Sequence, residues 1–289
     1  MELRVLRSFL AVAREGSVTG AANFLRVAQP TLSKRIKELE EELGTRLFVR
    51  RSHSVALTAE GMRLRKRAGE ILDLVEKTEA EFNPGGEAAS GEIHIGGGET
   101  RAMRLVADII GRVRRDHPGI RFKLHSGNAV DVIERLDKGL LDFGILLQPV
   151  ELEKYDYVNL PARDVWGLLM RKDSPLAKKR TIRRGDLSAV PLIVPRHGGM
   201  KNALVEWMGK DFDKLNVVAG YNLIYNASIL VEQGIGCALS IGGLVNAGGL
   251  CFRLLEPRVE SGLDIAWKKH QIFSSAAQVF LERVREKFA

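Results

Sequence analysis

Apolar side chains recur three and four positions apart along the N-terminal stretch, which is the spacing of an amphipathic helix. Glycines and one proline divide the pattern, so that it predicts three short helices. The first has its apolar face at Leu3, Leu6, Leu10 and Ala13 and ends at Gly16. The second is capped by Ser17 and carries Val18, Ala21, Ala22 and Leu25. The third begins near Pro30 and carries Leu32, Ile36, Leu39 and Leu43 before Gly44.

The third predicted helix has short polar and basic side chains near its start, away from the apolar stripe. The candidate nucleic-acid contacts there are Gln29, Pro30, Thr31, Ser33, Lys34 and Arg35. A helix in the major groove reads base edges with such groups. Glutamates between residues 38 and 42 would be repelled by phosphate. Only the first two turns of the helix can therefore approach DNA.

The segment RLFVRRSHSVALT, which follows Gly44, predicts two short strands around a turn at residues 51–54. This hairpin is a wing whose Arg50, Arg51 and His53 could reach phosphates or a minor groove. A small helical bundle with a hairpin and no nucleic-acid role would have the same element order.

The run SVTGAANFLRVAQPTLSKRIKELEEELGTRLFVRRSHSVALTAEG resembles the DNA-binding signature of LysR-type transcriptional regulators. The positions that match at the family's spacing are Ala21-Ala22, Gln29-Pro30, Leu32-Ser33, Ile36, Leu39-Glu40, Leu43-Gly44, Leu47-Phe48, Arg50, Val55, Leu57-Thr58 and Gly61. The chain departs from the family at Ala28, where a helix-capping Ser is common, and at His53, where Arg is usual. The resemblance implies sequence-specific binding to double-stranded promoter DNA.

Residues 58–82 contain no proline and predict one longer helix. Its apolar stripe, typical of a dimer seam, is Leu64, Ala68, Ile71, Val75 and Phe82. Packing against the chain's own C-terminal half would account for the same stripe. The resemblance favours the seam and implies a homodimer, or a homotetramer built from two dimers. Asn83-Pro84-Gly85-Gly86 breaks the helix, and a hinge follows as far as Gly91.

From residue 91 onward, strand-like and helix-like stretches alternate, which favours a mostly parallel sheet. The predicted strands are 92–96, 120–125, 141–146, 166–171, 192–194, 216–220 and 236–241. The predicted helices are 100–116, 129–138, 227–234 and 276–288, with another from about Asn202. This half resembles the LysR effector domain along its whole length, in segments such as HPGIRFKLHSGN, LDKGLLDFGILL and LVEQGIGCALSI.

The expected fold class is α/β: an N-terminal winged helix-turn-helix and a linker helix, followed by a two-lobed effector domain. The resemblance implies that this domain is periplasmic-binding-protein-like (type 2). We expect the DNA-binding domain at residues 1–58, the linker helix and hinge at 59–90 and the effector domain at 91–289. Lobe I would comprise about 91–161 and 267–289, and lobe II about 162–266.

Open α/β sheets bind ligands beyond the carboxyl ends of their strands, beside helix starts. The polar side chains at those places are Glu99, Thr100, Ser126, Asn128, Arg196, His197, Tyr221 and Asn222. Backbone N–H groups at helix starts favour anions, so a small-molecule effector with a carboxylate is one candidate. Glu99 favours an amine or a sugar instead. Helix capping without a ligand role would account for several of these residues equally well.

The net charge of +8 is placed unevenly along the 289 residues. Residues 1–67 hold 14 Lys and Arg against 7 Asp and Glu, whereas the remainder holds 30 against 29. A basic end suits a nucleic-acid partner, although a solvated basic surface has the same composition. For a protein bound at a promoter, RNA polymerase is a further candidate partner.

Several function classes find no support in the sequence. The N-terminal stretch is interrupted by Arg4, Arg7 and Arg14, and no apolar run is long enough for a bilayer. We therefore expect a cytoplasmic protein with no membrane partner. Cys237 and Cys251 fit neither a disulfide framework nor a zinc site, and we expect no metal or cofactor. No catalytic motif occurs, so we expect no enzyme. A ligand-independent DNA-binding protein and a moonlighting enzyme with an accessory DNA-binding module remain alternatives.

Overall fold

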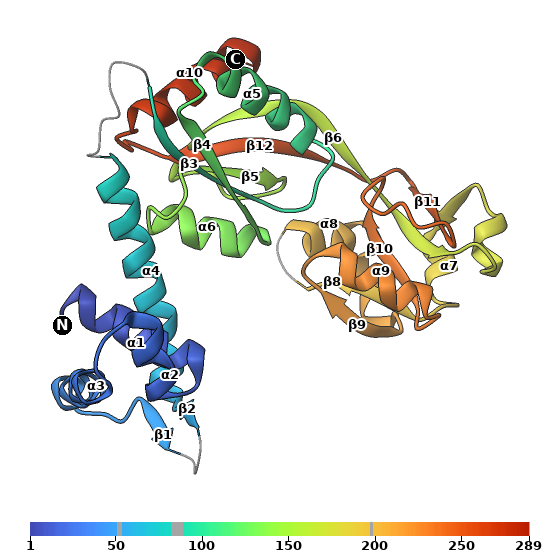
Figure 1. Ribbon diagram of the computed structural model, residues 1–289. Helices are drawn as coiled ribbons and strands as arrows, with labels where there is room; N and C mark the ends of the chain where they lie inside the picture. The colour runs from blue at the N-terminus through green and yellow to red at the C-terminus, as the bar shows by residue number, and fades with distance from the viewer. Residues whose placement is uncertain (51–53, 82–88, 197–198, 289) are drawn as a thin grey trace. The chain divides into compact units, whose positions relative to one another are not determined.

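The computed structural model describes residues 1–50, 54–81, 89–196 and 199–288 (Figure 1). The chain divides into two compact units, residues 1–83 and residues 84–289. Each unit has an apolar core of its own. Within the described ranges, no helix is long and apolar enough to cross a membrane.

The first unit is a small helical bundle with a hairpin (Figure 1). Its elements are α1 (Leu3–Glu15), α2 (Val18–Leu25), α3 (Gln29–Leu43), β1 (Phe48–Arg50), β2 (Val55–Leu57) and α4 (Ala59–Glu81). The predicted stripes of α2 and α3 enter the core with Ala21, Ala22, Leu32, Ile36 and Leu39, but α1 turns a different face inward, with Leu6, Phe9 and Val12. Leu3 and Leu43, which the stripes had included, are exposed because they stand at the first position of α1 and the last position of α3. α1 and α3 end at Gly16 and Gly44, whose φ angles of 61° and 64° are left-handed.

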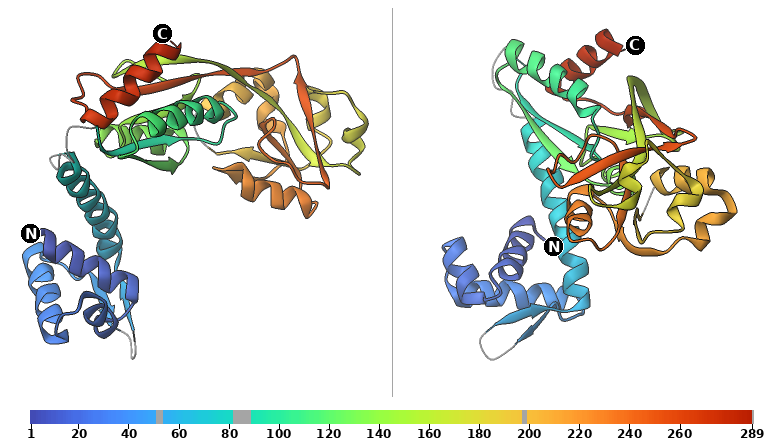
Figure 2. Two further views of the ribbon diagram at one scale, coloured as in Figure 1. Left: turned by 45° about the horizontal axis from the view of Figure 1, so that its top comes forward. Right: turned by 90° about the vertical axis from the view of Figure 1, so that its right-hand side faces the viewer.

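The second unit contains a sheet with the strand order β4-β3-β5-β12-β6-β10-β8-β9. Its first part, which we call lobe I, holds β3 (Gly91–Gly97), α5 (Met103–Asp116), β4 (Ile120–Ser126), α6 (Ala129–Asp137), β5 (Phe143–Leu147), β12 (Glu260–Lys268) and α10 (Ser275–Phe288). β3 runs parallel to both β4 and β5, as the alternating pattern predicts. α5 and α10 lie side by side on one face of these strands, and α6 covers the other (Figures 1 and 2).

The other part of the sheet, which we call lobe II, lies at the opposite end of the second unit (Figure 1). It holds η1 (Pro175–Lys178), β7 (Thr181–Arg183), α7 (Arg184–Leu187), β8 (Leu192–Pro195), α8 (Gly199–Met208), η2 (Gly209–Lys214), β9 (Val217–Tyr221), α9 (Ile224–Glu232), β10 (Cys237–Ile241) and β11 (Leu250–Glu256). β8 pairs parallel with both β9 and β10. Apolar clusters lie on both faces of these strands, with α9 on one side and α8 on the other.

Both lobes share β6 (Tyr155–Arg171), a strand of 17 residues. Its N-terminal part pairs with β12 in lobe I, and its C-terminal part, from Trp166, pairs with β10 and β11 in lobe II. The sequence predicts only residues 166–171 as strand, because polar side chains such as Asn159 and Asp164 interrupt the apolar pattern before them. β12 returns the chain to lobe I and pairs with β5 between Leu263 and Ala266.

Candidate ligand cavity and nucleic-acid interface

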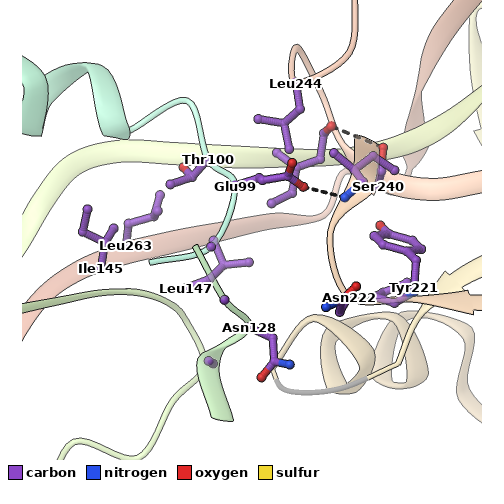
Figure 3. A pocket seen from close by; sticks show the side chains of 16 residues that line it. Glu99, Thr100, Asn128, Ile145, Leu147, Tyr221, Asn222, Ser240, Leu244 and Leu263 are labelled. Atoms are coloured by element: carbon purple, nitrogen blue, oxygen red, sulfur yellow. Dashed lines mark hydrogen bonds between the residues drawn. The ribbon is translucent and has the colours of Figure 1, made fainter. Parts of the chain in front are cut away.

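A cavity of about 760 Å³, including the open solvent at its mouth, lies where the strand ends of the two lobes face each other (Figure 3). Its lining comes from both lobes: Gly98, Glu99, Thr100, Gly127, Asn128, Ala129, Ile145, Leu147, Pro195, Tyr221, Asn222, Ile224, Ser240, Ile241, Leu244 and Leu263. Parallel strands place their carboxyl ends at one edge of a sheet, which is why loops far apart in sequence meet here.

Glu99 joins the two lobes across this cavity. It follows β3 in lobe I, and its Oε2 accepts a hydrogen bond of 2.5 Å from the backbone N–H of Ile224, the first residue of α9 in lobe II. The residue before the helix, Leu223, provides no side-chain cap. The Glu99 carboxylate therefore serves as the cap of α9 and stabilises its positive end.

Thr100 connects the cavity to the strand that both lobes share. Its hydroxyl donates to Oδ2 of Asp164 in β6 at 2.5 Å and accepts from the N–H of Ala102 at 3.0 Å. This second bond forms a turn, so α5 begins at Met103 rather than at Thr100 as predicted. Burial raises the pKa of Asp164, while the hydrogen bonds from Thr100 and from the backbone of Arg101 oppose that rise.

Two further hydroxyl groups in the cavity donate to the protein's own backbone. Tyr221 donates to the carbonyl oxygen of Leu239 at 2.7 Å, and Ser240 to that of Ile241 at 3.3 Å. Burial raises the pKa of Tyr221 well above its ordinary value, and the negative charge of Glu99 adds to this rise. Both hydroxyls can still accept a hydrogen bond from a ligand.

The two asparagines of the cavity act as local backbone acceptors. Asn128 Oδ1 accepts from the N–H groups of Val130 and Asp131, and so caps α6. Asn222 Oδ1 accepts from the N–H of Leu223 at 3.0 Å. Helix capping therefore accounts for part of the side-chain bonding here, while the amide nitrogens supply neutral donors.

The eight ligand-contact residues predicted from the sequence divide into three groups. Five of them line the cavity together: Glu99, Thr100, Asn128, Tyr221 and Asn222. Ser126 and Arg196 are exposed and are not part of its lining. His197 lies outside the described residues.

Sequence reasoning missed the apolar walls of the cavity and Ser240. The apolar walls include Ile145, Leu147, Leu244 and Leu263. Ile145 and Leu147 belong to β5, an apolar run that is typical of ordinary core, and Leu263 belongs to β12, which the sequence did not predict as a strand. The signal that could have found Leu147 is its position at the carboxyl end of β5, the kind of place where the ligand loops were predicted.

The start of α3 is exposed and carries polar side chains. Gln29, Pro30, Thr31 and Lys34 are exposed, whereas Ser33 and Arg35 are half-buried. Gln29 Nε2 donates to Ser33 Oγ at 2.8 Å. Ala28 gives the helix no side-chain cap, so its first N–H groups have no side-chain acceptor from that residue. Such groups are suited to a phosphate.

The hairpin β1–β2 pairs Phe48 with Leu57 and Arg50 with Val55, which gives the predicted wing its two strands. Arg51 and His53 lie outside the described residues, and for Arg50 the structure describes the backbone alone. Glu40 fixes the hairpin to α3, because its Oε1 accepts from the N–H groups of Leu47 at 2.7 Å and Phe48 at 3.2 Å. The sequence had suggested only an acidic, DNA-repelling role for this residue.

The apolar stripe predicted for α4 is divided in the structure. Leu64 and Ala68 pack into the core of the first unit, where Leu72 joins them. Ile71 and Leu74 are 36% and 42% exposed in the single chain. Phe82 lies outside the described residues.

Among the residues that the structure describes, no cluster of His, Cys, Asp or Glu could hold a metal ion. Cys237 and Cys251 are both free thiols, the first of them buried.

Two family models together match most of the chain. Residues 3–62 match the bacterial regulatory helix-turn-helix protein, lysR family, and residues 86–289 match the LysR substrate binding domain. The chain therefore belongs to the LysR family: it is a DNA-binding transcriptional regulator with an inducer-binding C-terminal domain. These matches confirm the predicted fold class.

Curated relatives extend over the same length. The transcriptional regulator YvbU of Bacillus subtilis (strain 168) is 30% identical over 295 residues, which cover 100% of this chain and 99% of that protein. The Hca operon transcriptional activator HcaR of Escherichia coli (strain K12) has the same identity and the same coverage.

A solved structure shares the fold over the whole chain. CbnR, a LysR family transcriptional regulator, has a TM-score of 0.79 at 21% identity, and the match covers 100% of both chains. CbnR complexed with its target DNA has a TM-score of 0.75, with 99% of both chains covered.

Proposed function

We propose that this regulator binds promoter DNA as a homodimer or homotetramer and that a small molecule in the cavity between lobes I and II controls it. The observation that carries the proposal is the cavity itself, because residues of both lobes line it and Glu99 links them across it. A ligand bound there has different contacts when the lobes move, so it can favour one arrangement of the domain.

The DNA half of the proposal rests on α3 and on charge. Residues 29–35 present exposed polar groups at a helix start, in the basic part of the chain. We assign base contacts to Gln29, Pro30, Thr31, Ser33, Lys34 and Arg35, and backbone contacts to Arg50, Arg51 and His53. CbnR, which has the same fold, has been solved with its target DNA.

The proposal also covers self-association of the chain, its location in the cell and its partner. The exposed apolar pair on α4, Ile71 and Leu74, suits contact with the same helix of a second copy. A regulator of promoters works in the cytoplasm beside RNA polymerase, a candidate partner. We assign it no catalytic activity, in keeping with the relatives, which are transcriptional regulators.

A paired mutational experiment tests both halves. Lys34→Ala should weaken specific DNA binding by about 1–3 kcal/mol and leave ligand affinity unchanged, since the side chain lies on the helix that we propose to contact DNA. Lys172→Ala, an equal charge change at an exposed site in lobe II, is the control and should leave DNA affinity unchanged. Fluorescence anisotropy on a selected DNA fragment measures the DNA affinity of both variants.

The ligand half is tested with Thr100→Val, which removes a cavity hydroxyl, and with the exposed Ser126→Ala as its control. We expect Thr100→Val alone to weaken a small molecule's effect on DNA binding. A small-molecule panel that never alters the DNA complex would favour the ligand-independent alternative. Turnover of a panel compound would favour the enzyme alternative.

A further inference from the structure

The electrostatics of the cavity are dominated by one side chain. Among the described residues that line it, Glu99 alone carries a formal charge. The other lining residues are neutral polar groups, glycines or apolar side chains. A ligand in this cavity therefore meets a negative charge, and none of the described lining residues is a cation that would neutralise it.

The backbone N–H groups at the two helix starts and the hydroxyl of Thr100 already donate to groups of the protein. The N–H at the start of α9 donates to Glu99, and the N–H groups at the start of α6 donate to Asn128. The hydroxyl of Thr100 donates to Asp164. A carboxylate ligand would have to break these bonds, or lie beside the negative charge of Glu99 with only the neutral side-chain amides of Asn128 and Asn222 as donors.

The acceptors, in contrast, remain suited to a cationic ligand. Glu99 accepts the Ile224 N–H through Oε2 (Figure 3), so a ligand could donate to its other oxygen, Oε1. The oxygens of Tyr221 and Ser240 donate to backbone carbonyls and keep lone pairs for a ligand N–H. An ammonium group supplies three donors and no acceptor, and so matches this arrangement.

The apolar part of the cavity lining is suited to the part of the ligand that does not contact Glu99. Ile145, Leu147 and Leu263 line the cavity from lobe I, and Leu244 lines it from lobe II (Figure 3). Apolar walls with a few polar groups are typical of small-molecule sites, where the walls hold the body and the polar groups set the orientation.

We infer that Glu99 is the specificity-determining residue of the cavity and that it selects an effector with an ammonium group on an apolar body. This inference rests on the proposed function, since it names the ligand class of the same site. It replaces the carboxylate considered from the sequence, because the helix start that would bind a carboxylate is occupied by Glu99.

The test uses three probes with the same branched chain: isopentylamine, isopentyl alcohol and isocaproate. Isothermal titration of the full-length protein at neutral pH measures each affinity. We expect wild type to bind the amine at least tenfold more tightly than the carboxylate. Glu99→Gln should reduce this preference to less than threefold, because Gln keeps an acceptor for the Ile224 N–H but loses the charge. Glu151→Gln, at an exposed site outside the cavity lining, should retain the wild-type preference.

Equal or tighter binding of isocaproate by wild type overturns the inference, as does a preference that Glu99→Gln leaves unchanged. Failure of all three probes to bind overturns it too. The proposed function is decided separately: it stands if other small molecules alter the DNA complex in a Thr100-dependent way, and fails if none does.

Discussion

Glu40 lies in the acidic run of α3, yet its side chain is only 12% exposed and holds the wing in place. Two backbone N–H groups, those of Leu47 and Phe48, converge on its Oε1. Removing an acceptor from partly buried donors costs more than an average hydrogen bond contributes. The neighbouring glutamates, by contrast, pair with lysines on the surface, as Glu38 does with Lys34.

Glu40→Ala should therefore lower the free energy of unfolding by about 1–3 kcal/mol, because two backbone N–H groups lose their acceptor. Glu38→Ala, on the same helix and 59% exposed, is the matched control and should change stability by less than about 0.5 kcal/mol. Urea denaturation followed by circular dichroism measures both. Equal effects of the two variants would contradict the structural role of Glu40.

Gly61 allows the start of α4 to pack closely on the chain before the wing. A Cβ atom at this position would lie 2.1 Å from the carbonyl oxygen of Leu47. The same place is fixed by Thr58, whose Oγ1 accepts from Gly61 N–H at 2.9 Å and donates to the carbonyl of Arg46 at 2.8 Å. This close approach explains why a glycine stands at the end of the DNA-binding signature.

Gly61→Ala should destabilise the protein by about 1–3 kcal/mol, since the backbone must move to admit the methyl group. Gly69→Ala is the matched control in the same helix, where a Cβ meets nothing within 4 Å. We expect it to raise stability by up to about 1 kcal/mol, because alanine favours the helix. Thermal unfolding distinguishes the two directions, and stabilisation by both changes would rule out the close contact.

Single residues of the cavity were predictable where they follow a strand and are polar. Glu99, Thr100 and Tyr221 were found in this way, and all line the cavity. Ser126 also follows this pattern but is not part of the lining, because it belongs to β4, the edge strand of lobe I, and its side chain is exposed. Distinguishing such positions requires the direction of each side chain, which depends on tertiary packing.

At the scale of elements, α4 has apolar side chains on two sides. Leu64, Ala68 and Leu72 stabilise the first unit, while Ile71 and Leu74 face away from that core. Met62 is also exposed, nine positions before Ile71 and so about half a turn away around the helix axis. The sequence stripe alone could not separate these faces, because the two partly overlap.

Ile71→Ser should weaken self-association by roughly tenfold, since an apolar side chain leaves the proposed seam. Met62→Ser, an exposed change on the other side of the same helix, is the control and should leave self-association unchanged. Sedimentation equilibrium measures the association constant. If only Met62→Ser dissociates the protein, the seam lies on the opposite face.

The elements that the sequence predicted well are those with a regular period. The helices of the first unit and the parallel strands of lobe I follow such patterns. β12 and the first half of β6 were missed because their buried polar residues, Asp164 and Asp264, break the apolar alternation. Asp264 is fully buried and bonded by the side-chain amides of Gln148 and Asn159, contacts that form only when distant strands meet.

At the scale of the whole effector domain, the continuous β6 is the physical link between the lobes. Asp164 pairs with Ser261 of β12, two residues before the pairing of β6 with β10 begins at Trp166, and it accepts a hydrogen bond from Thr100 in the cavity. A ligand that disturbs Thr100 therefore acts directly on the strand that both lobes share. This contact offers a short route from an occupied cavity to a change in lobe arrangement.

Asp164→Asn should change how the free energy of unfolding depends on pH, because it replaces a buried carboxyl with a group that does not titrate. Because burial raises its pKa in the folded protein, the native state holds the proton more firmly than the unfolded chain. Stability from this group is present below the unfolded pKa and is lost as pH rises through the folded pKa. The stability of wild type relative to Asp164→Asn should therefore fall as the pH rises above 3.8, the ordinary pKa of an aspartate side chain.

Unfolding free energies at a series of pH values check this expectation. Asp156→Asn, an exposed change in the same strand, is the control and should give a curve parallel to that of wild type. A wild-type curve that rises relative to Asp164→Asn over this range would show that the group is ionised and favourably paired instead.

The place of β6 between β10 and β11 also determines what the two thiols can do. Cys237 is in β10 and Cys251 in β11, on opposite edges of β6. Two strand spacings, roughly 9–10 Å, separate their backbones, whereas a disulfide needs Cα atoms within about 7 Å. An oxidant therefore cannot join the two sulfurs while the sheet is intact. Exposure to peroxide should not form an intramolecular disulfide between Cys237 and Cys251 in the folded regulator.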